Sequence, residues 1–199
     1  RLGLYRKTQP HVGFQLLKQW GDRLIHGTGV FTSNVDGHFQ AAGYEPATVQ
    51  ECHGSIHYLQ CLDQCCTDIW SADGLSPEVD VENCMLLNAA PTCPRCGGIA
   101  RPNIMMFNDW EWLESRQAEQ ERRMNNWLSG VRCPVVIEIG AGTAIPSVRH
   151  FSHQIIHAFG GRLVRINPRE SNVPTPFDVG LASSAVQALE AIESVMRLA

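Results

Sequence analysis

The chain has 199 residues, of which 44% are hydrophobic and 18% are charged, and its formal net charge is −4. These values are typical of one globular domain, or of one domain that carries a small insertion. They exclude the basic surface of a protein that binds nucleic acid nonspecifically, and no apolar run approaches the roughly 18 residues of a membrane span. No secretory leader opens the chain, and it begins at Arg1, so we expect a processed protein or a fragment.

The first predicted element is a helix over residues 8–20. Thr8 is suited to cap its N-terminus and Pro10 to occupy its first turn. Apolar residues recur there at four-residue spacing, which predicts one buried face. A short strand is predicted at residues 30–32, followed by a polar turn, and a further extended piece ends at His53.

Residues 55–103 differ from the rest of the chain, because they hold most of the cysteines and several Pro and Asp residues that interrupt regular structure. We interpret them as a small inserted module. Residues 101–107 then predict a strand that returns to the main body. A helix is predicted to begin at Asp109, as its cap, and to end at Gly130.

The last third of the chain predicts a βαβ unit. An apolar strand with a glycine turn spans residues 134–143, a helix spans 145–161 and a second strand spans 162–168. This order implies parallel strands with a right-handed crossover. An amphipathic helix over residues 181–198 closes the chain.

Two pairs of cysteines have the spacing of a metal site. They are Cys61 with Cys65 and Cys93 with Cys96, and the second pair lies in a Cys-x-x-Cys-Gly-Gly turn. Four thiolates close the coordination shell of Zn²⁺, which predicts one structural zinc ion; a redox dithiol is the alternative. Cys66 competes with Cys65 for the second position. The clustering also indicates a reducing, cytoplasmic location.

His53 is not needed as a ligand by this cysteine site. A histidine that ends a strand and precedes Gly-Ser is a candidate general base, although a single histidine is more often structural. The glycine turn at residues 140–143 is suited to contact a nucleotide, because glycines let backbone N–H groups approach phosphate or ribose oxygens. Such turns are also common without a ligand.

Taken in chain order, these motifs resemble the sirtuin family of NAD-dependent protein deacylases. The matching segments are FTSNVDG, ECHGS, the two cysteine pairs, RPNIMMFND, IGAGTAIPS and VRINP. The resemblance covers essentially the whole chain. It implies an α/β fold in which residues 1–54 and 104–199 form a Rossmann-like, NAD-binding domain and residues 55–103 form an inserted zinc-binding module.

The resemblance implies an enzyme that removes an acyl group from lysine, with nicotinamide, O-acyl-ADP-ribose and free lysine as products. His53 would be the general base, and Asn34 and Asp36 would share the catalytic site. The residues implied for binding of NAD are Ser33, Asn34, Asp36, Gly140, Gly142, Thr143 and Asn167. Phe107 and Asn108 would bind the acyl-lysine protein or peptide as an added strand. Neither membrane contact nor direct nucleic-acid binding is expected.

The chain also departs from the family pattern. The Gly-Ala-Gly-x-Ser loop that holds the pyrophosphate of NAD is absent, so we expect weak NAD binding and slow turnover by the chain as it stands. Ser33, Asn108 and Ala144 replace the usual Gln, Gly and Ser. Two alternatives stay open at this point. One is an NADase or ADP-ribosyl transferase on the same fold, and the other is a non-catalytic, zinc-bearing interaction protein.

Overall fold

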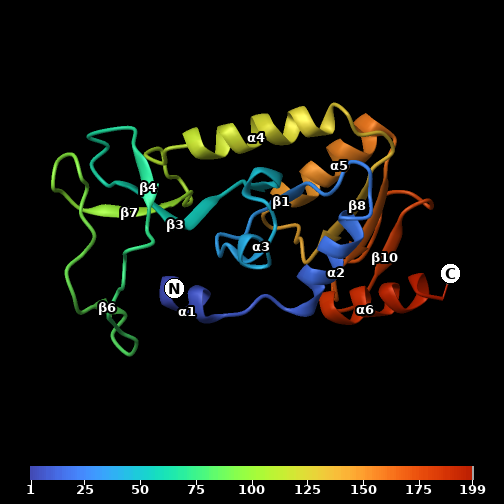
Figure 1. Ribbon diagram of the computed structural model, residues 1–199, viewed down its shortest axis with the longest axis horizontal. Coiled ribbons are helices and arrows are strands. Elements are labelled where there is room, and N and C mark those ends of the chain that lie inside the picture. The colour runs from blue at the N-terminus through green and yellow to red at the C-terminus, as the bar shows by residue number, and fades with distance from the viewer. Residues whose placement is uncertain (199) are drawn as a thin grey trace. The chain divides into compact units, whose positions relative to one another are not determined.

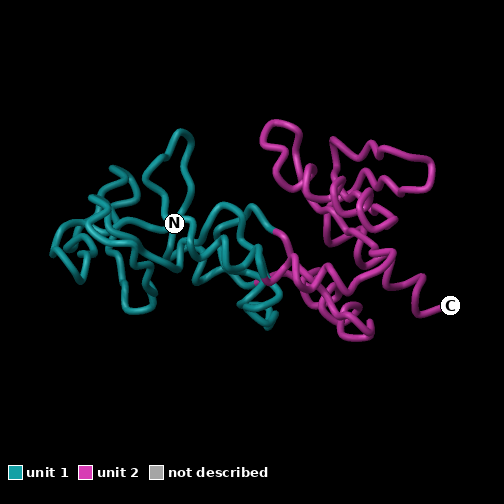
Figure 2. The backbone as a smooth tube through the Cα atoms, turned by 90° about the horizontal axis from the view of Figure 1, so that it is seen from above, with its two compact units in different colours: residues 1–9, 32–122 teal, residues 10–31, 123–199 magenta. Residues whose placement is uncertain are grey.

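The computed structural model describes residues 1–198, and the chain forms two compact units (Figure 2). Unit 1 consists of Arg1–Gln9 and Thr32–Arg122, and unit 2 of Pro10–Phe31 and Arg123–Ala199. Each unit therefore draws on two separate stretches of the chain. The boundaries predicted above for a sheet domain and an inserted module divide the chain in another way, and they stay a prediction.

Unit 1 is built on an antiparallel sheet with the strand order β4-β3-β7 (Figure 1). Its strands are β3 (Gly54–Cys61), β4 (Ile69–Ser71) and β7 (Ala100–Ile104), and a small ribbon pairs β5 (Val79–Asp80) with β6 (Met85–Leu86). The unit also holds α1 (Leu2–Lys7), α3 (His38–Ala41), the 3-10 helix η1 (Pro46–Thr48) and β2 (Val49–Glu51). Two elements continue from one unit into the other, β1 (Val30–Thr32) and α4 (Ser115–Leu128).

The start of β3 depends on a glycine. Gly54 has φ +80°, and a Cβ there would lie 2.1 Å from the carbonyl oxygen of Asn103 on β7. Only glycine tolerates both this left-handed backbone and this close approach. β3 can therefore pair with β7 immediately after His53, which fixes the direction in which the chain leaves that residue. Farther along β3, Leu59 packs with Ala72 and Ala100 in a small core.

Unit 2 contains a parallel sheet with the strand order β10-β9-β8. Its strands are β8 (Val135–Ile139), β9 (Arg162–Ile166) and β10 (Val179–Leu181), and its helices are α2 (Val12–Gly21), α5 (Ser147–Phe159) and α6 (Ala185–Met196). The predicted βαβ unit is confirmed as β8-α5-β9. The strand β10 was not predicted, because only three residues of it lie in regular structure.

Helices cover both faces of this parallel sheet. On one face Leu16 of α2 and Leu189 of α6 pack with Ile166 and with Ile137. Val136, the neighbour of Ile137, belongs to a second core that contains residues of α5 and of the last part of α4. Because successive side chains of a strand point to opposite faces, the two cores lie on opposite sides of the sheet. This is the Rossmann-like α/β arrangement expected from the sequence.

Two predicted helix starts are wrong. The stretch predicted as one helix from Thr8 consists of two helices, because Thr8 caps the end of α1 and α2 begins at Val12. Pro10 disfavours a helical residue before it, and the His11 side chain accepts the N–H of Gly13 in place of the predicted cap. The helix predicted from Asp109 begins only at Ser115.

Within residues 1–198, no helix is both long enough and apolar enough to cross a lipid bilayer.

Candidate active site

His53 lies in the turn between β2 and β3 and is tied to two loops of unit 1. Its ring forms a hydrogen bond with the backbone of Ser33, and its carbonyl oxygen accepts the N–H of Met105 at 3.0 Å. Partial burial lowers the pKa of His53 below its ordinary value of 6.5, although the Ser33 hydrogen bond acts in the opposite direction. The imidazole is therefore largely neutral at pH 7, which is the form that accepts a proton.

The neighbouring thiol has the opposite character. Burial raises the pKa of Cys52 to about 11, so this cysteine is a protonated thiol at neutral pH. It does not provide a thiolate nucleophile beside His53. Of these two neighbours, His53 is the group whose pKa suits proton transfer near neutral pH, and its role as general base stays a prediction.

The loop after β1 carries the other predicted catalytic residues. The N–H of Asn34 donates to Oγ1 of Thr32 at 3.1 Å, and Oδ1 of Asp36 accepts the N–H of His38 at 3.0 Å. These bonds shape the loop itself, and the contact of Ser33 with the His53 ring places the start of the loop beside His53. The structure therefore gathers the predicted catalytic residues, which are 19 positions apart in the sequence at their widest.

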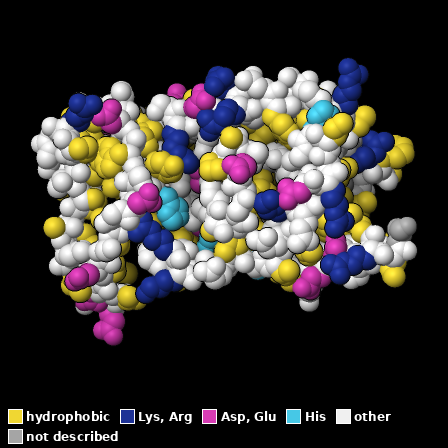
Figure 3. Space-filling view, viewed as in Figure 1, with side chains coloured by type: hydrophobic (Ala, Val, Ile, Leu, Met, Phe, Trp, Pro, Cys, Tyr) yellow, Lys and Arg dark blue, Asp and Glu magenta, His cyan; other side chains and the backbone are white. Residues whose placement is uncertain are grey.

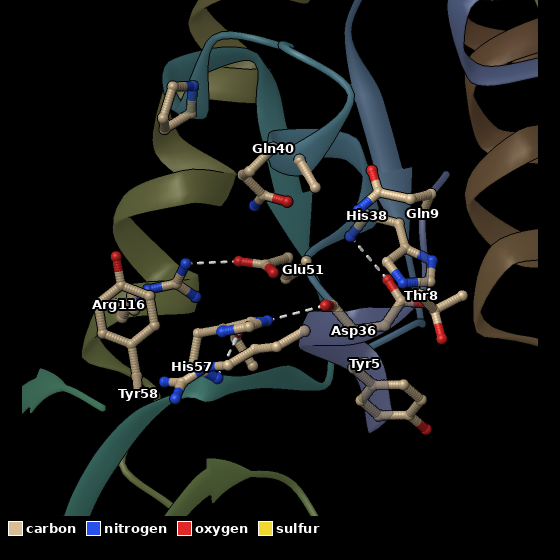
Figure 4. Close-up of a pocket in the computed structure, with 15 residues that line it drawn as sticks. Tyr5, Thr8, Gln9, Asp36, His38, Gln40, Glu51, His57, Tyr58 and Arg116 are labelled. Atoms are coloured by element: carbon tan, nitrogen blue, oxygen red, sulfur yellow. Dashed lines mark hydrogen bonds and ion pairs between the residues drawn. The ribbon is translucent and has the colours of Figure 1, made fainter. Parts of the chain in front are cut away.

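A cavity of about 440 Å³ lies beside this loop in unit 1 (Figure 4). Asp36, His57 and Tyr5 line it, and on another wall Arg116 lies over the ring of Tyr58 with its guanidinium carbon 3.9 Å from the ring centre. Figure 4 shows His57 pointing toward Asp36 and Arg116 pointing toward Glu51. The cavity is thus lined by both aromatic rings and charged groups.

A buried carboxylate anchors β2, two residues before His53. Glu51 is 1% exposed and accepts Nη2 of Arg116 at 2.5 Å and Nε2 of Gln120 at 3.2 Å, while its own N–H donates to Oε1 of Gln120. Both partners lie on α4. Because a buried carboxylate needs such partners, this network fixes the strand that leads into His53.

The loop after β7 holds Phe107 and Asn108 and is clamped at both ends. Arg101 donates to Asp109 at 2.7 Å, and although burial acts against it, this bond keeps the pKa of Asp109 below its usual 3.8. At the far end, buried Gln60 donates to the Glu111 carbonyl at 2.8 Å. These contacts explain why α4 begins at Ser115 and not at Asp109. They also present Phe107, which is 82% exposed, on a fixed loop.

The four predicted cysteines converge on one point of unit 1. The Sγ atoms of Cys61 and Cys96 are 3.8 Å apart, those of Cys65 and Cys93 are 3.6 Å apart, and all four lie within 4.8 Å of one another. A tetrahedral zinc ion with Zn–S bonds of about 2.3 Å separates its sulfurs by about 3.8 Å. The donor set fits one structural zinc ion, with Cys65 rather than Cys66 in the second position.

The backbone of the cysteine turn favours metal binding. The N–H groups of Cys96 and Arg95 point at the Cys93 sulfur and lower the pKa of that thiol to about 6. A thiolate is the form that binds zinc. Four sulfurs leave no coordination position for a reactive water, so the site supports the fold and not the chemistry.

In unit 2 the predicted nucleotide-contacting residues lie in two adjacent loops. Gly140, with φ +67°, follows β8, and Asn167 follows β9. The side chain of Asn167 donates to the Ala141 carbonyl at 3.0 Å, and Oγ1 of Thr143 donates to Glu170 at 3.4 Å. The loops at the carboxyl ends of these two parallel strands are therefore joined directly.

Arg149 of α5 also joins these loops, a role that was not predicted from the sequence. Its guanidinium donates to the Ala141 carbonyl at 2.9 Å and to the Glu170 side chain at 3.0 Å. Below the loops, Glu138 of β8 and Arg165 of β9 form a fully buried ion pair at 2.5 Å. A charged residue in each of two apolar strands was a sequence signal for this pair.

Comparisons with known proteins identify the family. A model of the Sir2 family matches residues 2–144. An NAD-dependent protein deacylase of Corynebacterium glutamicum is 27% identical, with 96% of this chain and 69% of the relative covered. An NAD-dependent protein deacetylase of Shouchella clausii is 29% identical over 89% of this chain and 65% of its own length. The chain belongs to the Sir2 family.

Solved structures show the same fold. A Sir2 homologue in complex with NAD matches this Sir2 protein with a TM-score of 0.68 and 22% identity, covering 97% of this chain and 67% of that one. A Sir2 protein bound to a propionylated peptide also gives 0.68 at 22% identity, covering 98% of this chain and 75% of the other. The family expected from the motif order is confirmed, and the parallel α/β fold with it.

Proposed function

We propose that this Sir2 protein is an NAD-dependent protein lysine deacylase that releases nicotinamide and forms O-acyl-ADP-ribose and free lysine. The observation that carries the proposal is the contact of two separate loops with His53 in unit 1. Its ring contacts Ser33 of the Asn34–Asp36 loop, and its carbonyl contacts Met105 of the Phe107 loop. The names of the relatives, deacylase and deacetylase, support the same activity.

His53 supplies the general base in this proposal. NAD, when bound, provides an electrophilic ribose carbon and a hydroxyl that receives the acyl group. His53 is largely neutral because burial lowers its pKa, so it accepts the proton of that hydroxyl at neutral pH. Asn34 and Asp36 orient the nicotinamide end, and their loop is held by the hydrogen bonds to Thr32 and His38.

The residues proposed to contact the adenosine end of NAD are Gly140, Gly142, Thr143 and Asn167. A Cβ added to Gly142 would meet nothing within 4 Å, so the backbone there is open to a ligand. The carboxyl ends of parallel strands are the common place for nucleotides in such sheets.

The acyl-lysine peptide is assigned to the Phe107 loop. Phe107 and Trp110 are 82% and 94% exposed on a loop that Asp109 and Gln60 hold in place. Exposed apolar groups on a fixed loop suit an extended peptide, whose backbone pairs with the loop as an added strand while its side chains cover the apolar surface.

Product analysis tests the proposal and separates it from the alternatives. The protein is incubated with NAD, with and without an acetyl-lysine peptide, and the products are identified by mass spectrometry. We expect nicotinamide and O-acetyl-ADP-ribose only when the peptide is present. Nicotinamide release without peptide would indicate an NADase, and attachment of ADP-ribose to protein a transferase.

The variant His53→Ala checks the assigned base. We expect turnover to fall by about 10²–10⁴-fold, the usual contribution of a general base, while the bound zinc and the melting temperature stay near the wild-type values. Loss of zinc in this variant would make His53 a metal ligand. Absence of NAD binding to a version of the protein that carries the pyrophosphate loop would favour the non-catalytic alternative.

A further inference from the structure

The loop that carries Asn34 and Asp36 receives its support from β3. The carbonyl of Val35 accepts the N–H of Ile56 at 3.0 Å. The next carbonyl along the loop, that of Asp36, accepts Nε2–H of the His57 ring at 2.8 Å. Consecutive residues of the strand thus hold consecutive residues of the loop, the first with a backbone group and the second with a side chain.

The contact between His57 and this loop is close enough to require glycine. A Cβ added to Gly37 would lie 2.7 Å from Cδ2 of the His57 ring, and Gly37 has φ +73°. The ring is therefore packed against the backbone of the loop as well as bonded to it. Figure 4 shows Asp36 between the two histidines, with the His57 ring pointing toward it from one side and His38 on the other.

His57 is itself held from the other side of β3. Its carbonyl accepts the N–H of Ala72 at 2.9 Å, next to β4. The carbonyl of Ala72 in turn accepts Nη2 of Arg6 at 2.7 Å. The ring is therefore attached to a strand position that has hydrogen bonds to neighbours outside the loop.

From this geometry we infer that His57 is a positioning residue for the proposed reaction: its ring sets the backbone of the Asn34–Asp36 loop opposite His53. His53 and His57 both follow β2 and are four positions apart. His53 contacts Ser33, and His57 contacts Asp36. The two histidines therefore hold the two ends of the loop. This inference rests on the proposed function, because that function gives the Asn34–Asp36 loop its role in the reaction.

The test compares His57→Leu with His57→Gln. Leucine removes the donor at similar volume, whereas glutamine carries an amide N–H at a similar reach. His157→Leu is the matched control, because His157 is exposed on α5 in unit 2. The readouts are hydrogen exchange of residues 33–38 and steady-state kinetics with NAD and an acetyl-lysine peptide.

In His57→Leu we expect the rate of amide hydrogen exchange of residues 33–38 to rise about two- to tenfold, because one ordinary hydrogen bond is lost. kcat should fall by a similar factor while KM for the peptide is unchanged. His57→Gln should restore both, and His157→Leu should change neither. Gly37→Ala breaks the same contact from the other side and should give the same exchange pattern, so the inference can be tested even if His57→Leu does not fold.

Unchanged exchange of residues 33–38 in folded His57→Leu and Gly37→Ala overturns the inference. So does faster exchange with an unaltered kcat, or failure of glutamine to rescue. If the wild-type protein produces no O-acetyl-ADP-ribose, the proposed function fails on its own evidence, and the exchange data alone decide whether His57 holds the loop.

Discussion

At the scale of single residues, the chemistry of the site depends on the protonation state of His53. The folded protein disfavours the charged imidazolium because the ring is partly buried, and its pKa lies below 6.5. The neutral base therefore predominates at pH 7 and is lost as the pH falls through this lowered value. As the pH falls, His53 of the unfolded chain binds a proton first, near pH 6.5, and His53 of the folded protein binds one only at lower pH. Acidification therefore also lowers the stability of the folded protein.

The lowered pKa of His53 predicts how the activity falls on the acid side of the pH profile. The kcat/KM of deacylation should be flat around pH 7 and should fall with an apparent pKa below 6.5. The measurement is kcat/KM between pH 5 and 8 with a peptide whose own groups do not titrate there. An apparent pKa above 6.5 would contradict the assignment of His53 as a partly buried base.

Some residues of the site were visible in the sequence and others were not. His53, Asn34 and Asp36 stand in short motifs that resemble those of the Sir2 family, so their roles could be proposed from the sequence. The role of Glu51 could not, because its partner Arg116 is 65 positions away. Burial of a carboxylate is decided by which distant cation the fold brings to it, and no local pattern reports that.

At the scale of secondary-structure elements, features set by the local sequence were again predicted, and features set by distant contacts were not. The strands and helix of the βαβ unit follow local periodicity and were predicted within a few residues. The late start of α4 was not, since it depends on Gln60, which is 53 positions from Leu113 and accepts its N–H at 3.1 Å. Tertiary contacts that occupy backbone groups override helix propensity in such a segment.

The turn after β8 gives a prediction in which stability and binding are separated. A Cβ at Gly142 meets nothing within 4 Å, whereas Gly140 has φ +67° and is strained by any side chain. We therefore expect Gly142→Ala to keep the wild-type melting temperature but to weaken NAD binding, and Gly140→Ala to lower the melting temperature. Calorimetric titration with NAD and thermal melting distinguish the two. Unaltered NAD affinity in Gly142→Ala would remove this turn from the proposed site.

The cysteine cluster gives a second prediction at this scale. Cys96→Ser should lose the bound zinc, which elemental analysis of the purified protein measures, and should destabilise β3 and β7, because the metal stabilises only the folded module. Cys66→Ser is the control, since Cys66 lies outside the four-thiol group formed by the described residues. Retention of one zinc per chain by Cys96→Ser would overturn the ligand set.

At the scale of the whole molecule, the two units have separate cores. The small core around Leu59 belongs to unit 1, and the cores around Leu189 and Ile155 belong to unit 2. In Figure 3 the apolar side chains exposed on unit 1 gather at the left-hand end, over the region of β4 and β7. Because zinc binds the folded site and not the unfolded chain, the region around the four cysteines of unit 1 depends on its metal for stability.

This division predicts the effect of metal removal. A chelator should speed hydrogen exchange in residues 54–104 by at least tenfold and leave β8, α5 and β9 near their original rates. Mass-spectrometric exchange of the holoprotein before and after chelation makes the comparison. Equal loosening of unit 2 would show that the metal stabilises the protein as one cooperative body.

The buried pair of Glu138 and Arg165 has a consequence for how this sequence can change over time. Replacing Glu138 alone leaves the Arg165 guanidinium in the core of unit 2 without its carboxylate, whereas replacing Arg165 alone leaves Glu138 with only the more distant Arg149, at 4.0 Å. Removing one partner of a buried pair typically costs about 3–5 kcal/mol, whereas replacing both with apolar residues of similar volume is often neutral. A lineage that mutates one position at a time therefore meets a barrier between two acceptable states. Among descendants of this chain, the two positions should be inherited as a unit, either both charged or both apolar.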